Sequence, residues 1–123
     1  MKSLTKAEEQ IMLILWQLGK GFLKDILQNH PEPQPHSNTV ATVLKVLGEK
    51  GFVTTEVHGR NNLYIPAVSK EAYGKKTVNQ VVKGYFENSP SKLLSHFVNE
   101  KKISTEELEQ LLNQIKSSKK NSK

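Results

Sequence analysis

The stretch PHSNTVATVLKVLGEKGF, residues 35–52, predicts a helix whose two faces differ in side-chain size. Apolar residues recur at i, i+3, i+4 and i+7, the spacing of a buried helical stripe: Val40, Val43, Leu44 and Leu47. The opposite face starts with short side chains and continues with charged ones: Asn38, Ala41, Thr42, Lys45 and Glu49. Short side chains leave the helix backbone open to close approach. We therefore expect this face to meet a partner surface.

The residues on either side of this helix indicate where it begins and ends. Ser37 is placed to cap its N-terminus, and Gly51 is placed to end it. The preceding segment HPEPQPH, residues 30–36, contains three prolines, which exclude a helix and predict an extended linker.

Two further helices are expected upstream. Thr5 and Glu8 form a potential capping box for a helix that ends at Gly19 or Gly21. Its apolar face contains Ala7, Ile11, Ile14, Leu15 and Leu18, with Met12 and Trp16 beside them. A short second helix is expected over residues 23–30. We expect Trp16 to lie in the core rather than to serve as a stacking platform.

A β-hairpin is expected after the third helix. The runs FVTTEV (residues 52–57) and NLYIP (residues 62–66) are rich in β-branched and aromatic residues, and HGRN separates them. Gly59 supplies the positive φ that the turn needs, and Pro66 ends the second strand. Three helices followed by a hairpin are the plan of a winged helix, a variant of the helix-turn-helix.

The rest of the chain predicts three amphipathic helices. They begin at Ser69, at the Ser89–Pro90 cap, and at the Ser104/Glu107 capping box. Because three short helices cannot enclose a core, they need a partner surface, either the first domain or a second copy of the chain. We favour the second copy, because apolar stripes that follow a compact domain commonly form dimers. The residues predicted to form this dimer contact are Val78, Val81, Val82, Tyr85, Leu93, Leu94, Phe97, Leu108, Leu111, Leu112 and Ile115.

The expected fold class is therefore mainly α with a small β-hairpin. A winged helix-turn-helix domain is predicted over residues 1–68 and a helical dimerisation region over residues 69–116. Residues 117–123 are expected to form a flexible basic tail.

Composition restricts the possible functions. The net charge is +6, but residues 1–66 carry seven Lys or Arg against six Asp or Glu, so bulk charge is weak support for nucleic-acid binding. The chain has no cysteine, which excludes disulfides and thiolate metal sites and fits a reducing cytoplasm. No apolar run approaches the ~20 residues needed to cross a bilayer, and no N-terminal signal is recognisable. We expect a soluble, cytoplasmic protein.

Catalysis and metal binding are not predicted. The four histidines share no metal-ligand spacing, and Ser37 lacks a His and a carboxylate at motif spacing. No enzyme activity, cofactor or metal is therefore expected.

A winged helix places its third helix in the DNA major groove, which would explain why one face of the helix over residues 37–50 carries short side chains. Asn38 can contact adenine in bidentate fashion, and the methyl groups of Ala41 and Thr42 can meet a thymine methyl. Lys45 can reach a base edge or a phosphate, while Thr39 suits packing or a phosphate. The full set expected at DNA is Ser37, Asn38, Thr39, Ala41, Thr42, Lys45, and Arg60, Asn61 and Asn62 at the hairpin tip.

Four blocks of the sequence together carry a family resemblance over residues 3–116. They are LTKAEEQIMLILW (4–16), NTVATVLKVLGEKGFV (38–53), GRNNLYIPAVSKEAY (59–73) and LLSHFVNEKKISTEELEQL (93–111). In their order and spacing they resemble the BlaI/MecI penicillinase-repressor family. The resemblance implies a winged-helix homodimer with intertwined C-terminal helices, which binds a dyad-symmetric DNA operator and represses transcription of β-lactamase or other antibiotic-resistance genes.

The resemblance also implies an induction route. Family members are inactivated by proteolysis in the C-terminal helices, together with a membrane-bound metalloprotease sensor, at an Asn-Phe bond in well-known members. The aligned bond here is His96–Phe97, which departs from that pattern, and Phe97 equally suits a dimer core. Ala41 and Val46 stand where some relatives carry basic residues, so an operator sequence cannot be transferred. A copper-responsive branch carries a cysteine cluster that this chain lacks.

Two other functions remain open from the sequence. The winged helix could be a protein-interaction module, although its third helix lacks the long apolar outer face that docking a protein favours. Alternatively, a DNA-binding repressor could respond to a small molecule, such as a hydrophobic ligand between the dimer helices.

Overall fold

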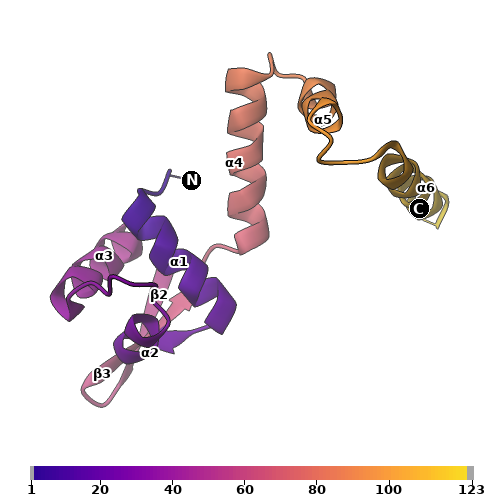
Figure 1. The fold of residues 1–123 in the computed structure, drawn as a ribbon. Coiled ribbons are helices and arrows are strands. Elements are labelled where there is room, and N and C mark those ends of the chain that lie inside the picture. Colours follow the sequence, from indigo (N-terminus) through magenta and orange to yellow (C-terminus); the bar gives the residue numbers. More distant parts are fainter. Residues whose placement is uncertain (1, 122–123) are drawn as a thin grey trace. The chain divides into compact units, whose positions relative to one another are not determined.

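A computed structural model describes the backbone of residues 2–121 and the side chains of residues 2–117. The chain forms two compact units, Met1–Lys75 and Lys76–Lys123, called here the winged-helix unit and the C-terminal unit. The winged-helix unit contains three helices and a small antiparallel sheet, and the C-terminal unit is helical (Figure 1). The predicted fold class, mainly α with a winged helix-turn-helix, is confirmed.

Helix α1 (Lys6–Leu18) begins and ends as its sequence predicts. The Thr5 hydroxyl accepts from the Glu8 N–H (3.2 Å), and the Glu8 carboxylate accepts from the Thr5 N–H (2.8 Å), which completes the capping box. The helix ends at Gly19, whose φ of 85° favours glycine. Its buried face consists of Ile11, Met12, Ile14 and Leu15.

Helices α2 (Leu23–Gln28) and α3 (Ser37–Glu49) follow, with a non-helical linker between them. The predicted cap of α3 was wrong by one residue: His36 is the N-cap, and its Nδ1 accepts from the Asn38 N–H (3.1 Å). Ser37 is already helical, so its hydroxyl is not in the capping position. The buried stripe of α3 is as predicted, with Val40, Leu44 and Leu47 almost fully buried and Val43 half-buried.

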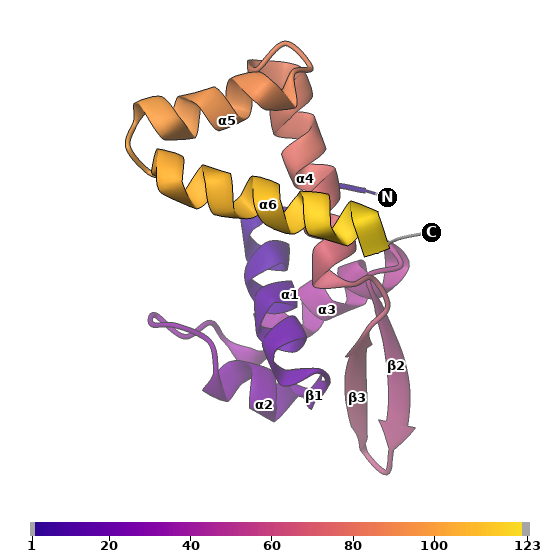
Figure 2. The same cartoon turned by 90° about the vertical axis from the view of Figure 1, so that its right-hand side faces the viewer.

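The hairpin consists of β2 (Val53–His58) and β3 (Asn61–Pro66), joined by a two-residue turn in which Gly59 has a φ of 62°. A third strand, β1 (Gly21–Phe22), pairs with the other edge of β3 and gives the order β1-β3-β2. Two residues are too few to show the alternation of a strand, so the sequence predicted only the hairpin. The hairpin projects beyond the three helices (Figure 2).

The core of the winged-helix unit lies where α1 and α3 meet the sheet. Its most deeply buried large side chains come from α1, α2, α3 and the residue before β2: Phe52, Met12, Leu15, Ile26, Leu44, Leu47 and Val40. Trp16 is half-buried against this core, and its Nε1–H donates to the Val68 carbonyl (2.8 Å). The prediction of a packing role for Trp16 is confirmed.

Helix α4 (Lys70–Tyr85) begins in the winged-helix unit and continues into the C-terminal unit, where α5 (Pro90–Asn99) and α6 (Thr105–Asn121) follow. Ser89 caps α5 and Pro90 is its first residue, as predicted. Ser104 accepts from the Glu107 N–H (3.1 Å) at the start of α6.

The predicted domain bounds describe function and remain predictions. The compact winged-helix unit of the structure runs to Lys75, beyond residue 68, because the first turn of α4 packs on its core. Helix α6 also continues to Asn121 through most of the segment expected to be a flexible tail, residues 117–123, since no Gly or Pro interrupts it. Residues 122–123 lie outside the described residues.

Candidate nucleic-acid interface

The outer face of α3 is the face that we expected to meet a partner. Asn38, Thr39, Thr42 and Lys45 are exposed, and Ser37 and Ala41 are half-buried. The Thr42 hydroxyl donates to the Asn38 carbonyl oxygen (2.9 Å). Because this bond uses the hydroxyl proton inside the helix, the methyl group of Thr42 remains for an apolar contact. The face therefore combines small apolar groups with one amide and one cation.

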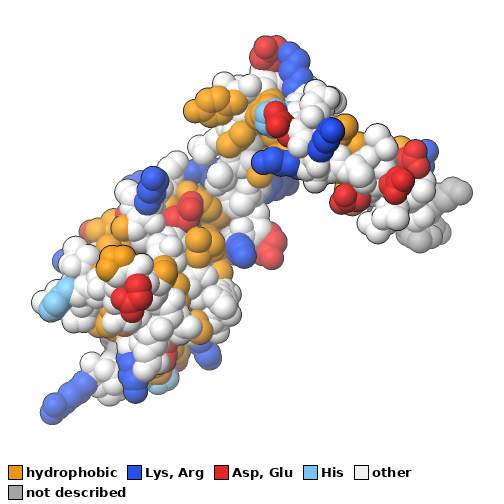
Figure 3. Space-filling view, viewed as in Figure 1, with side chains coloured by type: hydrophobic (Ala, Val, Ile, Leu, Met, Phe, Trp, Pro, Cys, Tyr) orange, Lys and Arg blue, Asp and Glu red, His pale blue; other side chains and the backbone are white. Residues whose placement is uncertain are grey.

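The hairpin, residues 53–66, is called here the wing. In its register His58 lies opposite Asn61, so that Gly59 and Arg60 alone form the turn. Arg60, Asn61 and Asn62 are all exposed. Figure 3 shows Lys and Arg side chains (blue) projecting at the end of the hairpin. The tip of the wing thus presents a cation and two amides.

A groove separates α3 from the wing, and is called here the inner groove. It is lined by Ala41, Leu44, Lys45, Gly48 and Glu49 of α3 and by Thr55, Asn62 and Tyr64 of the wing. Two predicted residues of the helix, Ala41 and Lys45, therefore share a concave surface with Asn62 of the wing. Thr55 and Tyr64 were not predicted, because the alternation of a strand does not show which face a helix leaves open.

A second groove, called here the tip groove, shares Asn62 and Tyr64 of the wing with the inner groove. It is lined by Phe22, Leu23, Lys24 and Asp25 around the start of α2 and by Arg60, Asn61, Asn62 and Tyr64 of the wing. The Asp25 carboxylate accepts from the Phe22 N–H (2.9 Å), which holds the first turn of α2 beside the wing. Lys24 is exposed in that turn and was not predicted from the sequence.

The cations of these two grooves are not neutralised by neighbouring acids. Within the part of the chain that the structure describes, the charged side-chain groups of Lys24, Lys45 and Arg60 form no hydrogen bond or ion pair. By contrast, His58 on the wing lies 2.7 Å from Glu56. Unpaired cations in two adjoining grooves beside a projecting hairpin suit the negative charge of a phosphate backbone.

The residues predicted for dimerisation all lie in the C-terminal unit, and most are exposed in the single chain. Val82 is buried, and Leu93, Phe97 and Leu108 are half-buried. The others are exposed: Val78, Val81, Tyr85, Leu94, Leu111, Leu112 and Ile115. His96, at the candidate cleavage bond, is exposed on α5 with its ring centroid 5.7 Å from that of Phe86.

Among residues 2–121, no group of three or more His, Asp or Glu side chains lies close enough to hold a metal ion. None of the described helices is long and apolar enough to cross a membrane.

Residues 4–117 match the family described as penicillinase repressor. The chain belongs to the penicillinase repressor family. The match covers most of both units and includes all four sequence blocks that carried the resemblance. The repressor is accordingly a DNA-binding transcriptional regulator and not an enzyme.

Two solved structures resemble the repressor. One, described as the CopR repressor structure, is 30% identical, with a TM-score of 0.47, over 55% of this chain and 100% of that chain. The other is BpsR of Bordetella bronchiseptica, described for regulation of its DNA binding by 6-hydroxynicotinic acid. It is 17% identical, with a TM-score of 0.49, over 97% of this chain and 77% of that chain. A comparison with curated protein sequences gives no match. The assignment rests on the family match.

Proposed function

We propose that the repressor binds a dyad-symmetric DNA operator as a homodimer and blocks transcription by occupying promoter DNA. The observation that carries this proposal is that the α3 face with short side chains lies across the inner groove from a projecting wing. In this arrangement α3 of each protomer enters a major groove, and the two half-sites lie about one helical turn apart.

Each exposed group at the interface has a role that fits its chemistry. Asn38 reads adenine, and the methyl groups of Ala41 and Thr42 meet thymine methyl groups. Lys45 contacts a base edge or a phosphate from the inner groove. Backbone contacts come from Ser37 and Thr39 near the start of α3 and from Arg60, Asn61 and Asn62 at the wing. Lys24 joins them because it shares the tip groove with Arg60.

Dimerisation would cover the apolar side chains of the C-terminal unit. Tyr85 is 83% exposed and Ile115 is 53% exposed in the single chain. Burying one such side chain contributes about 1.5–3 kcal/mol, so a second copy that covers several of them forms a stable dimer. Orange side chains at the surface over α4 and α5 are visible in Figure 3. Functionally, residues 1–68 then read DNA and residues 69–116 join the protomers.

Relief of repression follows from this division between DNA-reading residues and residues that join the protomers. Cutting the His96–Phe97 bond would separate the protomers, and each winged helix alone would hold DNA weakly. The bond lies inside α5, no residue of which is buried in the single chain, so unwinding this helix for a protease disturbs the proposed dimer contact but not the core of the protomer. Family resemblance suggests a membrane-bound metalloprotease sensor as the trigger and resistance genes as targets. Because its ligand is DNA, we expect the repressor to act in the cytoplasm.

The first experiment selects an operator from a random duplex pool and titrates the purified protein against it and a scrambled duplex. We expect a preference of ~10³-fold or more for the selected duplex, with two chains per site. Equal, weak binding to both duplexes that disappears with added salt would contradict sequence-specific repression and favour a protein-interaction role.

Cleavage is tested separately by co-expressing the repressor with the candidate sensor protease and measuring fragment masses after induction. The expected fragments end at His96 and begin at Phe97. Intact protein in induced cells whose target genes are transcribed would contradict this route and favour a small-molecule signal.

A further inference from the structure

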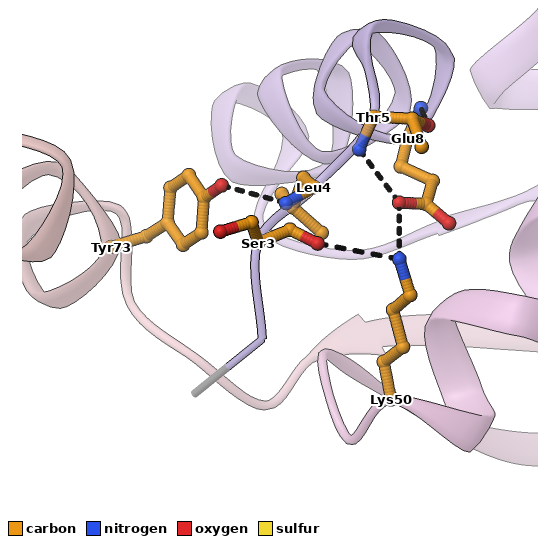
Figure 4. A network of polar contacts seen from close by, with 6 residues as sticks. All are labelled: Ser3, Leu4, Thr5, Glu8, Lys50 and Tyr73. Atoms are coloured by element: carbon orange, nitrogen blue, oxygen red, sulfur yellow. Dashed lines mark hydrogen bonds and ion pairs between the residues drawn. The ribbon is translucent and has the colours of Figure 1, made fainter.

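The N-terminal arm, Ser3–Thr5, lies between the end of α3 and the start of α4 (Figure 4). On one side, Lys50, the C-cap residue of α3, donates to the Ser3 carbonyl oxygen (3.3 Å) and to Glu8 Oε1 (2.7 Å). On the other side, the Leu4 N–H donates to the Tyr73 hydroxyl (2.9 Å). The three residues of the arm thus connect the end of α3 to the first turn of α4.

The contact between the arm and α3 is built around a buried charge. Glu8 is 6% exposed, and its Oε1 also accepts from the Thr5 N–H. Burial by itself raises the pKa of Glu8, but hydrogen bonds from Lys50 and Thr5 and the charge of Lys50 together lower it below its ordinary value. The carboxylate is therefore ionised at neutral pH and holds Lys50 in place.

The contact at α4 is built around an aromatic cluster. Tyr73 is 8% exposed, with its ring centroid 5.5 Å from that of Phe52 and 6.1 Å from that of Trp16. Trp16 in turn donates to the Val68 carbonyl, two residues before the helix begins. The segment from Val68 to Tyr73 is thereby held at both ends on the core of the winged-helix unit.

We propose that Tyr73 and the N-terminal arm are positioning elements for operator recognition, which hold the first turn of α4 in register with the end of α3. Helix α4 is continuous from this turn into the C-terminal unit that joins the protomers. Because α4 is anchored at its start, we infer that α3 of each protomer has a restricted position in the dimer. The repressor then accepts only a narrow range of half-site spacing. This inference rests on the proposed function, because it requires a dimer on a two-part operator.

The test measures binding to the selected operator and to versions with one or two base pairs added to or removed from its centre. One base pair rotates a half-site by roughly 35°, so the wild-type affinity should fall about tenfold or more for each step. Tyr73→Leu, which removes both the ring contacts and the hydroxyl, should flatten this profile to within about threefold. Ile26→Ala is the matched control, since it opens the same core without touching the junction and should keep the wild-type profile.

A Tyr73→Leu profile as steep as that of the wild type, or a wild-type profile that is already flat, would overturn the proposal. If Tyr73→Leu does not fold, Tyr73→Phe decides, because it keeps the ring and removes the hydroxyl that accepts from the Leu4 N–H. An unchanged profile in that variant would then overturn the proposal. Wild-type protein that binds the full operator no better than a single half-site would instead contradict the dimeric function itself.

Discussion

Replacing Lys24 by glutamine should weaken DNA binding through one lost phosphate contact per protomer. Lys24 is exposed, has no partner among the described residues, and lines the tip groove with Arg60. Each neutralised phosphate contributes about 0.9 to the slope of log K against log salt concentration. A dimer with two substituted protomers should therefore lose about 1.8 from this slope. The loss should be the same for the operator and a scrambled duplex, because phosphates carry no sequence information.

The magnitude is large enough to measure by fluorescence anisotropy. Between 50 mM and 200 mM salt, a slope difference of about 1.8 changes the ratio of wild-type to variant affinity about 12-fold. Lys6→Gln is the matched control: it removes the same charge from an exposed position in α1 that lines neither groove. Lys45→Gln should differ from Lys24→Gln and Lys6→Gln, because it should lose more affinity for the operator than for the scrambled duplex.

The double variant Lys24→Gln/Arg60→Gln tests whether the two cations hold the same phosphate. If they do, its slope should fall by less than the sum of the two single losses, because one phosphate releases its counterion only once. A Lys24→Gln variant whose affinity and slope equal those of Lys6→Gln would refute the assignment of the tip groove to the DNA backbone.

Three further perturbations test other parts of the molecule. Glu8→Gln should lower the free energy of unfolding by about 1.5–3 kcal/mol at pH 7. Because the pKa of Glu8 is lowered in the fold, the stability difference between wild type and variant should persist above pH 4.5 and shrink as the pH falls further. Urea denaturation at several pH values measures it, and a constant difference down to pH 3 would contradict the assignment. Leu94→Asp should raise the dimer dissociation constant about 100-fold or more in sedimentation equilibrium, whereas the similarly exposed Leu13→Asp should not. Gly59→Val should cost about 1–2 kcal/mol of stability by forcing a β-branched residue to a φ of 62°, and an unchanged thermal midpoint would exclude strain at this turn.

The elements that the sequence predicted well are those whose signals are local. The capping box of α1 depends on residues three positions apart, and the buried stripe of α3 on residues three or four apart. The turn of the wing depends on one glycine between two β-rich runs. Since each of these patterns lies within one element, its chemistry could be interpreted without knowing the fold.

The parts that were missed depend on contacts that residue spacing within one element does not show. His36 rather than Ser37 caps α3, because a ring nitrogen happens to face the Asn38 N–H. Strand β1 exists only because β3 offers an edge to two residues that show no pattern of their own. Lys24 joins the candidate interface because β1 and Asp25 set the start of α2 beside the tip of the wing.

Tyr73 shows most clearly why periodicity cannot define a functional boundary. Its position just after Ser69 predicted the first turn of a dimerisation helix, and nothing in the spacing of α4 distinguishes it from the apolar residues that follow. Its hydroxyl accepts from Leu4, 69 residues away, and its ring packs on Phe52. The same helix therefore serves the winged-helix unit through its first turn and the C-terminal unit through the remainder. A domain boundary placed at the start of α4 would separate Tyr73 from Leu4 and Phe52. These are the contacts through which, we infer, dimerisation restricts DNA recognition.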